Sequence, residues 1–449
     1  MDRFSQSSSS AGAPTNSTEA SRSSLNSMLA RPSVPPRPPE HLRLDQVSDF
    51  IDDAKLPPPR SAVDVLFSKQ LAGAEKRKAN SIYHIDMSLS SSTVATKHGN
   101  NIIKFWSVPT GSLFTSVKVQ AYIEARSRSR DYIIRSHTIL SESAQLAAIA
   151  THFGRTIEIW NFTKPKRLQT IEDADRWVAS RFESYGSGWS ALAAYRSRDS
   201  VIDLFAATTR DKKPFLKVRT IDLRKAGLPL LPQFPELAIS STSPLLIAAS
   251  GPRTPRAGHP PPDRETLLVA WDISDYRDVS SKPYRVVRPW QHRELETAMP
   301  CELVIYGDII ISMWIPAGHR TVTKTKASGD FEYTLAPTPV PFRYVLVWDL
   351  SENSTRTYGI PNTTCCISPD CRFVAYCHIA DKRSKLAILD AQSGDELWSV
   401  GGEGAQTSLQ SMGDLAKVTE IGFSPDSLHI ILGDSDGNAS LFDVRETIK

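Results

Sequence analysis

The chain has 449 residues, a net charge of +4, five Cys, 31 Pro and 22 Gly. An apolar fraction of 40% with 23% charged residues is typical of a folded globular protein, so disorder throughout the chain is excluded. Five Cys is an odd and sparse number for a chain of this length, which argues against a secreted disulfide scaffold, so we predict reduced thiols and a cytoplasmic or nuclear location. The small net charge does not indicate nucleic-acid binding.

The start of the chain is polar and Ser-rich, without the apolar run of a secretory signal peptide. The most apolar stretch, residues 302–318, carries Asp308 at its centre. It is shorter than the roughly 20 apolar residues that a membrane-spanning helix needs. We therefore expect no membrane segment.

Residues 1–60 are rich in Ser and Pro, a composition that buries too little apolar surface to offset the chain entropy. This predicts a disordered tail. Within it, Pro32, Pro35 and Arg37 form a Pro-x-x-Pro-x-Arg arrangement that an aromatic polyproline-binding groove, such as that of an SH3 domain, could accept. Pro-rich linkers also produce such arrangements by chance, so both interpretations stay open.

Residues 61–449 change to short alternating apolar runs separated by Gly, Asp, Asn, Ser and Pro, which is the pattern of many short strands. Long helical periods are missing from this region. One type of run, apolar and often ending in an aromatic and a polar residue, recurs at intervals typical of a repeat architecture. Its seven copies are residues 102–108, 156–162, 201–207, 267–273, 345–350, 386–391 and 440–444.

The last two units are the most regular. Each carries Ser-Pro-Asp before its second strand, at 368–370 and 424–426, and Trp-Asp pairs occur at 271–272 and 348–349. This organisation resembles the WD-repeat (WD40) β-propeller family. The resemblance implies an all-β, seven-bladed β-propeller of four-stranded blades over residues 61–449. The family's Gly-His pair before each first strand is missing, which marks a divergent member.

Such a ring has to close. Only five residues follow Val444, so the seventh unit has no fourth strand of its own at the C-terminus. Residues 62–69 have the length and the alternation of a strand and precede the first strand of unit one. We predict that this N-terminal strand completes the seventh blade, and that the Trp or Phe near the end of each third strand fills the gap between blades.

Two long insertions, residues 250–265 and 316–341, separate the second and third strands of the fourth and fifth units. Alternate loops of a propeller emerge on opposite faces, so these two emerge side by side on one face. Loops on a rigid scaffold are where binding residues concentrate, although polar insertions without a partner are equally compatible with the pattern. We predict a protein- or peptide-binding surface formed by Arg253, Arg256, Arg264, Arg320, Lys324 and Lys326.

The end of the seventh unit also resembles the box by which some WD-repeat proteins dock as substrate receptors on cullin-RING ubiquitin ligases. Asp436, Asp443 and Arg445 occupy its charged positions, whereas Phe442 stands where the box prefers Trp. The alternative without a binding function is that these side chains only cap a strand and its turn.

Catalytic motifs are missing: the sequence has no nucleophile elbow, zinc-binding helix or phosphate-binding loop. The cluster Cys365, Cys366, Cys371, Cys377 and His378 lacks the paired Cys-x-x-Cys spacing of zinc sites. We expect Cys371 and Cys377 on one strand, on the face that also carries Phe373 and Ala375, as buried apolar thiols.

The sequence therefore predicts a non-enzymatic interaction scaffold without metal or cofactor. A ubiquitin-ligase receptor is the second prediction. A propeller enzyme with a site in its central channel is the alternative from a different class, and it would require titratable groups clustered around that channel.

Overall fold

A computed structural model describes residues 62–71, 80–99, 101–119, 137–180, 192–208, 213–252, 265–275, 277–380, 383–401 and 414–447. All of them belong to one unit of the chain, Pro58–Lys449. The predicted tail, with its motif at Pro32, Pro35 and Arg37, lies outside the described residues. Within them, no helix combines the length and the apolar character that crossing a bilayer requires.

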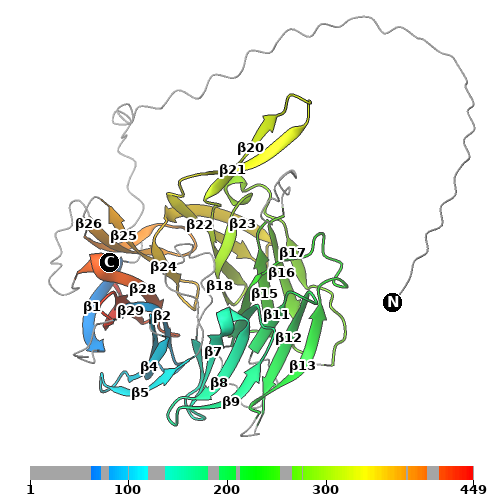
Figure 1. Cartoon of the computed structure of the whole chain (residues 1–449). Helices are drawn as coiled ribbons and strands as arrows, with labels where there is room; N and C mark the ends of the chain where they lie inside the picture. The colour runs from blue at the N-terminus through cyan, green and yellow to red at the C-terminus, as the bar shows by residue number, and fades with distance from the viewer. Residues whose placement is uncertain are drawn as a thin grey trace, which may run out of the picture. The chain divides into compact units, whose positions relative to one another are not determined.

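The described residues form a β-propeller of seven antiparallel four-stranded sheets, which confirms the predicted fold class. Figure 1 shows the blades following one another around a central axis, so that the first (blue) and last (red) strands lie side by side. Consecutive strands of a blade are antiparallel neighbours, as expected for short alternating runs joined by tight turns.

Blade 1 consists of β2 (Ile82–Met87), β3 (Thr93–His98), β4 (Ile102–Ser107) and β5 (Leu113–Lys118), and blade 2 of β6 (His137–Ser141), β7 (Leu146–Thr151), β8 (Thr156–Asn161) and β9 (Lys166–Ile171). Blade 3 consists of β10 (Arg176–Ala179), β11 (Leu192–Arg196), β12 (Val201–Ala207) and β13 (Phe215–Asp222), and blade 4 of β14 (Glu236–Ile239), β15 (Leu245–Ser250), β16 (Leu267–Asp272) and β17 (Arg285–Val287). Blade 5 consists of β18 (Met299–Tyr306), β19 (Ile309–Ile315), β22 (Phe342–Asp349) and β23 (Ser354–Pro361), and blade 6 of β24 (Thr364–Ile367), β25 (Phe373–Ala380), β26 (Arg383–Asp390) and β27 (Glu396–Gly401). Blade 7 consists of β28 (Val418–Phe423), β29 (His429–Asp434), β30 (Ala439–Thr447) and β1 (Ala62–Leu71).

Each of the seven recurring runs is the third strand of a blade, as predicted. The aromatic residues near their ends fill the gaps between blades. Trp271 of blade 4 packs in one apolar cluster with Ile202 and Leu204 of blade 3. Trp348 of blade 5 is fully buried in the next cluster, against blade 4. Because neither face of a four-stranded blade is covered within the blade itself, this stacking builds the core.

The predicted closing strand is confirmed. β1 pairs with β30 from Ala62 opposite Thr447 to Leu71 opposite Ala439, so it extends two residues beyond the predicted segment. Val63 and Val65 are buried in the cluster shared by blades 6 and 7. Leu71 is buried in the cluster shared by blades 7 and 1. The closing strand therefore contributes to the two blade interfaces on either side of blade 7.

A buried Ser stands at the end of the first strand in six blades, and in blades 1, 2, 4, 6 and 7 its hydroxyl accepts a backbone amide of the segment that follows. In blade 6, the Ser368 hydroxyl donates to Asp370 (2.7 Å) and accepts the amide of Phe373 (2.8 Å). The sequence indicated this turn only in blades 6 and 7, where Pro and Asp follow the Ser. The six are Ser88, Ser141, Ser180, Ser240, Ser368 and Ser424.

The prediction that Cys371 and Cys377 lie on one face of the same strand is wrong. Cys371 has a φ of 58° and lies in the turn before β25, because that tight turn needs a left-handed residue. It packs between blades 5 and 6, whereas Cys377, Phe373 and Ala375 pack between blades 6 and 7. Both thiols are buried and free, as expected, and burial raises their pKa, that of Cys377 to about 11.

Candidate functional site

The insertion of blade 5 forms its own two-stranded sheet, β20 (His319–Thr325) and β21 (Phe331–Pro337), between the second and third strands, as predicted. Figure 1 shows this hairpin projecting beyond the sheets of the blades. The insertion of blade 4 leaves between the equivalent strands, β15 and β16. Since the second strands of neighbouring blades run in the same direction, both insertions leave from the same face, here called the insertion face.

The hairpin brings together only part of the predicted basic surface. Lys324 and Lys326 are exposed. Lys324 stands opposite Glu332 in the strand register, so the charge along this part of the hairpin is mixed. Arg320 stands opposite Ala336, and its side chain is not described. Three predicted residues lie outside the described part of the chain: Arg253, Arg256 and Arg264.

The centre of the ring holds a cavity of about 240 Å³, lined by residues from the first strands of all seven blades. Its charged groups connect neighbouring blades. His84 of blade 1 lies 3.9 Å from the carboxylate of Glu420 of blade 7, measured from Nδ1 to Oε1. Glu302 of blade 5 accepts the amide of Ile367 of blade 6 at 3.1 Å. These groups therefore hold the ring together around the channel.

Three thiols also line the channel, those of Cys301, Cys365 and Cys366. Arg343 donates from Nη1 to the sulfur of Cys365 at 3.3 Å. Burial raises the pKa of Cys301 and Cys366 well above the usual value, so both are neutral thiols at pH 7 and poor nucleophiles. Among the described residues, no group of three His, Cys, Asp or Glu side chains is placed to hold a metal ion. The channel therefore holds two neutral thiols, and the third thiol, that of Cys365, has the Arg343 guanidinium beside its sulfur.

Two of the candidate ligase-docking residues, Asp443 and Arg445, lie on β30. Asp443 accepts from Arg445 Nη2 at 3.4 Å and lies 3.6 Å from His429 Nε2. Asp436 lies in the turn before β30, where it forms an ion pair with Lys417 (2.7 Å). The fold thus places Asp436 before the first residue of the strand, away from the other two residues, and each of the three has a local partner.

Models of known protein families and curated protein sequences give no match to this chain.

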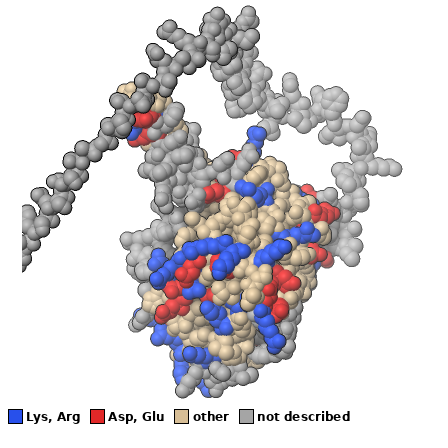
Figure 2. Space-filling view, turned by 90° about the vertical axis from the view of Figure 1, so that its right-hand side faces the viewer, with Lys and Arg blue, Asp and Glu red and all other residues tan. Residues whose placement is uncertain are grey.

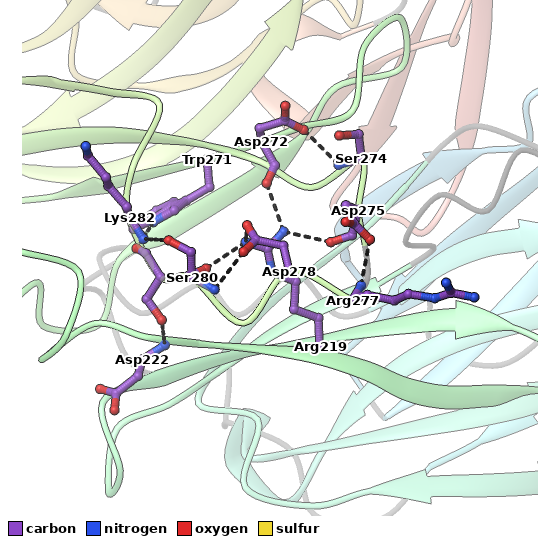
Figure 3. Close-up of polar contacts among 11 residues, drawn as sticks. Arg219, Asp222, Trp271, Asp272, Ser274, Asp275, Arg277, Asp278, Ser280 and Lys282 are labelled. Atoms are coloured by element: carbon purple, nitrogen blue, oxygen red, sulfur yellow. Dashed lines mark hydrogen bonds and ion pairs between the residues drawn. The ribbon is translucent and has the colours of Figure 1, made fainter.

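One polar cluster that sequence analysis missed joins blades 3 and 4 (Figure 3). Arg219 on β13 is buried, with its side chain only 3% exposed. It reaches into the segment between β16 and β17 of the neighbouring blade, which is described over residues 273–275 and 277–284 and is here called the clamped loop. Its Nη1 donates to the carbonyls of Asp272 (3.0 Å) and Asp275 (3.2 Å). Its Nη2 donates to the carboxylate of Asp278 and the carbonyl of Ser280, both at 2.9 Å.

Further bonds fix the same loop. The Ser281 hydroxyl accepts the amide of Asp222 at 2.8 Å, and the Ser281 carbonyl accepts the indole N–H of Trp271 at 3.0 Å. Asp272, Asp275 and Asp278 each accept the amide two residues on, which is the Asx-turn pattern. An Asp at every third position was a sequence signal for these turns. Nothing in the sequence indicated Arg219, since its partners lie 53 to 61 residues further along the chain.

A buried lysine in blade 1 gives a testable pH dependence. Lys97 on β3 is 3% exposed, and burial lowers its pKa from 10.5 to about 6. Between these two values the unfolded chain carries a proton that the folded chain does not, so this group makes stability rise with pH. We expect Lys97→Met to raise the free energy of unfolding at pH 7 by about 1–3 kcal/mol.

Urea unfolding between pH 6 and 9 measures this effect. The Lys97→Met variant should show a flatter rise of stability with pH than the parent. Lys118→Met, which changes an exposed lysine on β5 of the same blade, serves as the control and should be nearly neutral. An unchanged pH slope in Lys97→Met would contradict the assignment.

Proposed function

We propose that this chain is a divergent WD-repeat protein that acts as a non-catalytic scaffold and holds a partner protein on its insertion face. The observation that carries the proposal is the β20–β21 hairpin, an exposed two-stranded sheet mounted on a closed seven-bladed ring. Such a hairpin adds nothing to the blade sheets, since its strands pair only with each other. Its length is therefore better explained by binding than by folding.

Membership of the family is supported by several features together. These are the four-stranded blades, the N-terminal strand that completes blade 7, and the Ser that ends the first strand in six blades. A fold alone does not determine function. The non-catalytic assignment is supported by the channel, whose charged groups contact neighbouring blades and in which Cys301 and Cys366 are neutral thiols.

The mechanism is rigid presentation. The ring keeps the base of the hairpin in place, and a few residues near its tip anchor the partner. Lys324 and Lys326 are exposed and would contribute charge-assisted contacts. Because exposed charges are screened by salt, binding should weaken as ionic strength rises.

Two variants test the proposal. Replacing residues 319–337 by a short Gly-Ser turn removes the hairpin, and Lys324→Glu with Lys326→Glu reverses its charge. Both variants should keep the thermal unfolding of the parent, because the hairpin does not pair with any blade strand. In affinity purification with quantitative mass spectrometry, we expect a stoichiometric partner whose recovery falls about tenfold or more in both variants.

The matched control is Lys164→Glu with Lys166→Glu, which reverses two exposed charges in the turn between the third and fourth strands of blade 2, on the opposite face. This control should keep the partner. Recovery of the same partners by all variants would overturn the proposal. Recovery of a ubiquitin-ligase adaptor that depends on Asp443 and Arg445, and not on the hairpin, would instead support the receptor prediction.

A further inference from the structure

The three thiols of the central cavity differ in what surrounds each sulfur. Cys301 and Cys365 are partly exposed, whereas Cys366 is buried, and all three line the cavity. A thiolate is a far better nucleophile than a neutral thiol, so a cysteine reacts at pH 7 only where its surroundings favour the charged form. The groups in contact with each sulfur therefore decide which of the three can be modified.

Arg343, near the start of β22 in blade 5, places its guanidinium against the sulfur of Cys365 on β24 in blade 6. Nη1 donates to Cys365 Sγ at 3.3 Å. The surface cations of the face drawn in Figure 2 lie among Asp and Glu side chains and are open to solvent. Arg343 differs from them, since it is only 7% exposed. Water therefore screens its charge less, and a positive charge in contact with a sulfur favours the thiolate.

A second hydrogen bond holds the guanidinium in this position. Arg343 Nε donates to Asn362 Oδ1 at 2.8 Å. The side-chain amide of Asn362 donates to the carbonyl of Val340, and its backbone amide donates to the carbonyl of Pro341, both at 2.8 Å. The charge beside Cys365 is therefore fixed by a network of hydrogen bonds, as in preorganised reactive sites.

The negative groups of the same cavity oppose the effect of Arg343. They are the carboxylates of Asp86, Glu302 and Glu420. Glu302 accepts the backbone amide of Ile367, and Glu420 lies 3.9 Å from His84. These contacts are made to other groups, whereas the hydrogen bond of Arg343 is made to the sulfur itself.

The two neighbouring thiols are protonated at pH 7, because burial raises the pKa of Cys301 and Cys366 well above the usual value. Cys301 donates to the carbonyl of Met313 at 3.4 Å. The sulfur of Met313 lies 2.8 Å from that of Cys365, so a second oxidisable sulfur adjoins the site. Cys365 is thus the cavity thiol with a guanidinium on its sulfur and access to solvent.

We propose that Cys365 is a modification site, at which a peroxide oxidises the sulfur to a sulfenic acid. The thiolate sulfur attacks one oxygen of hydrogen peroxide, and an S–O bond forms as the O–O bond breaks. The sulfur gives up two electrons, and the peroxide is reduced to hydroxide, which takes up the proton that the thiol released and leaves as water. Because Cys301 and Cys366 are protonated, they attack the sulfenic acid slowly, and it persists long enough to be trapped.

This site is independent of the proposed function. Oxidation of one sulfur in the cavity requires neither a bound partner nor the β20–β21 hairpin. It is also a single event rather than turnover, since the thiol is regenerated only when an external thiol reduces the sulfenic acid. Either proposal can therefore fail its test without affecting the other.

Oxidation of the reduced full-length protein in the presence of dimedone tests the proposal. Dimedone reacts with sulfenic acids and leaves thiols unchanged, and peptide mass spectrometry locates its adducts. With hydrogen peroxide at pH 7, we expect labelling of Cys365 to exceed that of each other Cys by about tenfold or more. Cys301 is the internal control, because it lines the same cavity and is also partly exposed.

Two substitutions test the role of the guanidinium. Arg343→Met should lower the initial rate of Cys365 labelling by about tenfold or more, and Arg343→Lys, which keeps a positive charge, should recover part of that rate. Cys371→Ser removes a buried thiol elsewhere in blade 6 and should leave the rate unchanged. Labelling of the parent protein decides the proposal even where Arg343→Met does not fold.

Three results would overturn the proposal. The first is equal labelling of Cys301 and Cys365, which would mean that exposure alone determines reactivity. The second is addition of the oxygen to Met313 without an adduct at Cys365. The third is an unchanged labelling rate in a folded Arg343→Met variant.

Discussion

Removing residues 1–71 is expected to abolish cooperative unfolding of the propeller, whereas removing residues 1–61 is expected to leave it nearly unchanged. The ten residues that distinguish these truncations are β1. Without them, β30 becomes an open edge strand and blade 7 has only three strands. Thermal unfolding followed by circular dichroism compares the two proteins.

The expected loss of stability is large because β1 contributes both backbone hydrogen bonds and buried apolar side chains. Val63, Val65 and Leu71 are buried, at about 1.5–3 kcal/mol for each fully buried side chain. Their sum alone approaches the total stability of a typical domain, about 5–15 kcal/mol. Lys69 adds a bond from its ammonium to the carbonyl of Val108 (2.7 Å), which ties the strand to blade 1.

A point variant covers the case in which the longer truncation does not yield soluble protein. Val65→Asp buries a carboxylate in the cluster shared by blades 6 and 7 and should lower the free energy of unfolding by about 3 kcal/mol or more. Leu66→Asp, next to it on the same strand, changes an exposed side chain and serves as the control. Equal effects of the two truncations, or of the two point variants, would contradict closure by β1.

Arg219→Met is expected to lower the free energy of unfolding by about 3 kcal/mol. The substitution keeps much of the apolar volume of the side chain and removes its four hydrogen bonds to blade 4, one to the end of β16 and three to the clamped loop. Three backbone carbonyls and the Asp278 carboxylate lose their donor as a result. Urea unfolding of the parent and the variant measures the loss.

Lys217→Met is the matched control for this variant. Lys217 lies on the same strand, is exposed, and forms a long ion pair with Asp203 (3.6 Å), so its removal should cost less than about 1 kcal/mol. Hydrogen exchange adds a local readout: the amides of Arg277 and Ser280 should lose protection in Arg219→Met alone. Unchanged exchange in the loop would show that Arg219 does not hold it.

Much of the fold was predictable because its signals are local. Six of the seven recurring runs carry a Trp or Phe near their end, such as Trp271 and Trp348, and the closing strand was indicated by its alternation and by the short C-terminus. The turn after the first strand was recognised only in blades 6 and 7, where Pro and Asp follow the Ser. A lone Ser, as at Ser88 or Ser240, is too common a residue to be recognised as a turn signal.

The site predictions depended on the same local signals, and fewer of them than of the fold predictions were confirmed. The insertions were placed correctly between the second and third strands, since insertion length can be read directly from the repeat. Cys371 was wrongly assigned to a strand, because the alternation of side chains applies only within a strand and the first residue of β25 could not be read from the sequence. Cys371 belongs to the turn that precedes this strand.

By itself, the sequence determined the repeat, the number of blades and the way the ring closes, because each follows from apolar periodicity and turn residues within a few positions. Tertiary structure alone decided that Arg219 of blade 3 holds the clamped loop of blade 4. Such contacts depend on which blade stacks against which. A buried guanidinium finds its partners across that interface, at sequence separations where no local pattern connects the residues.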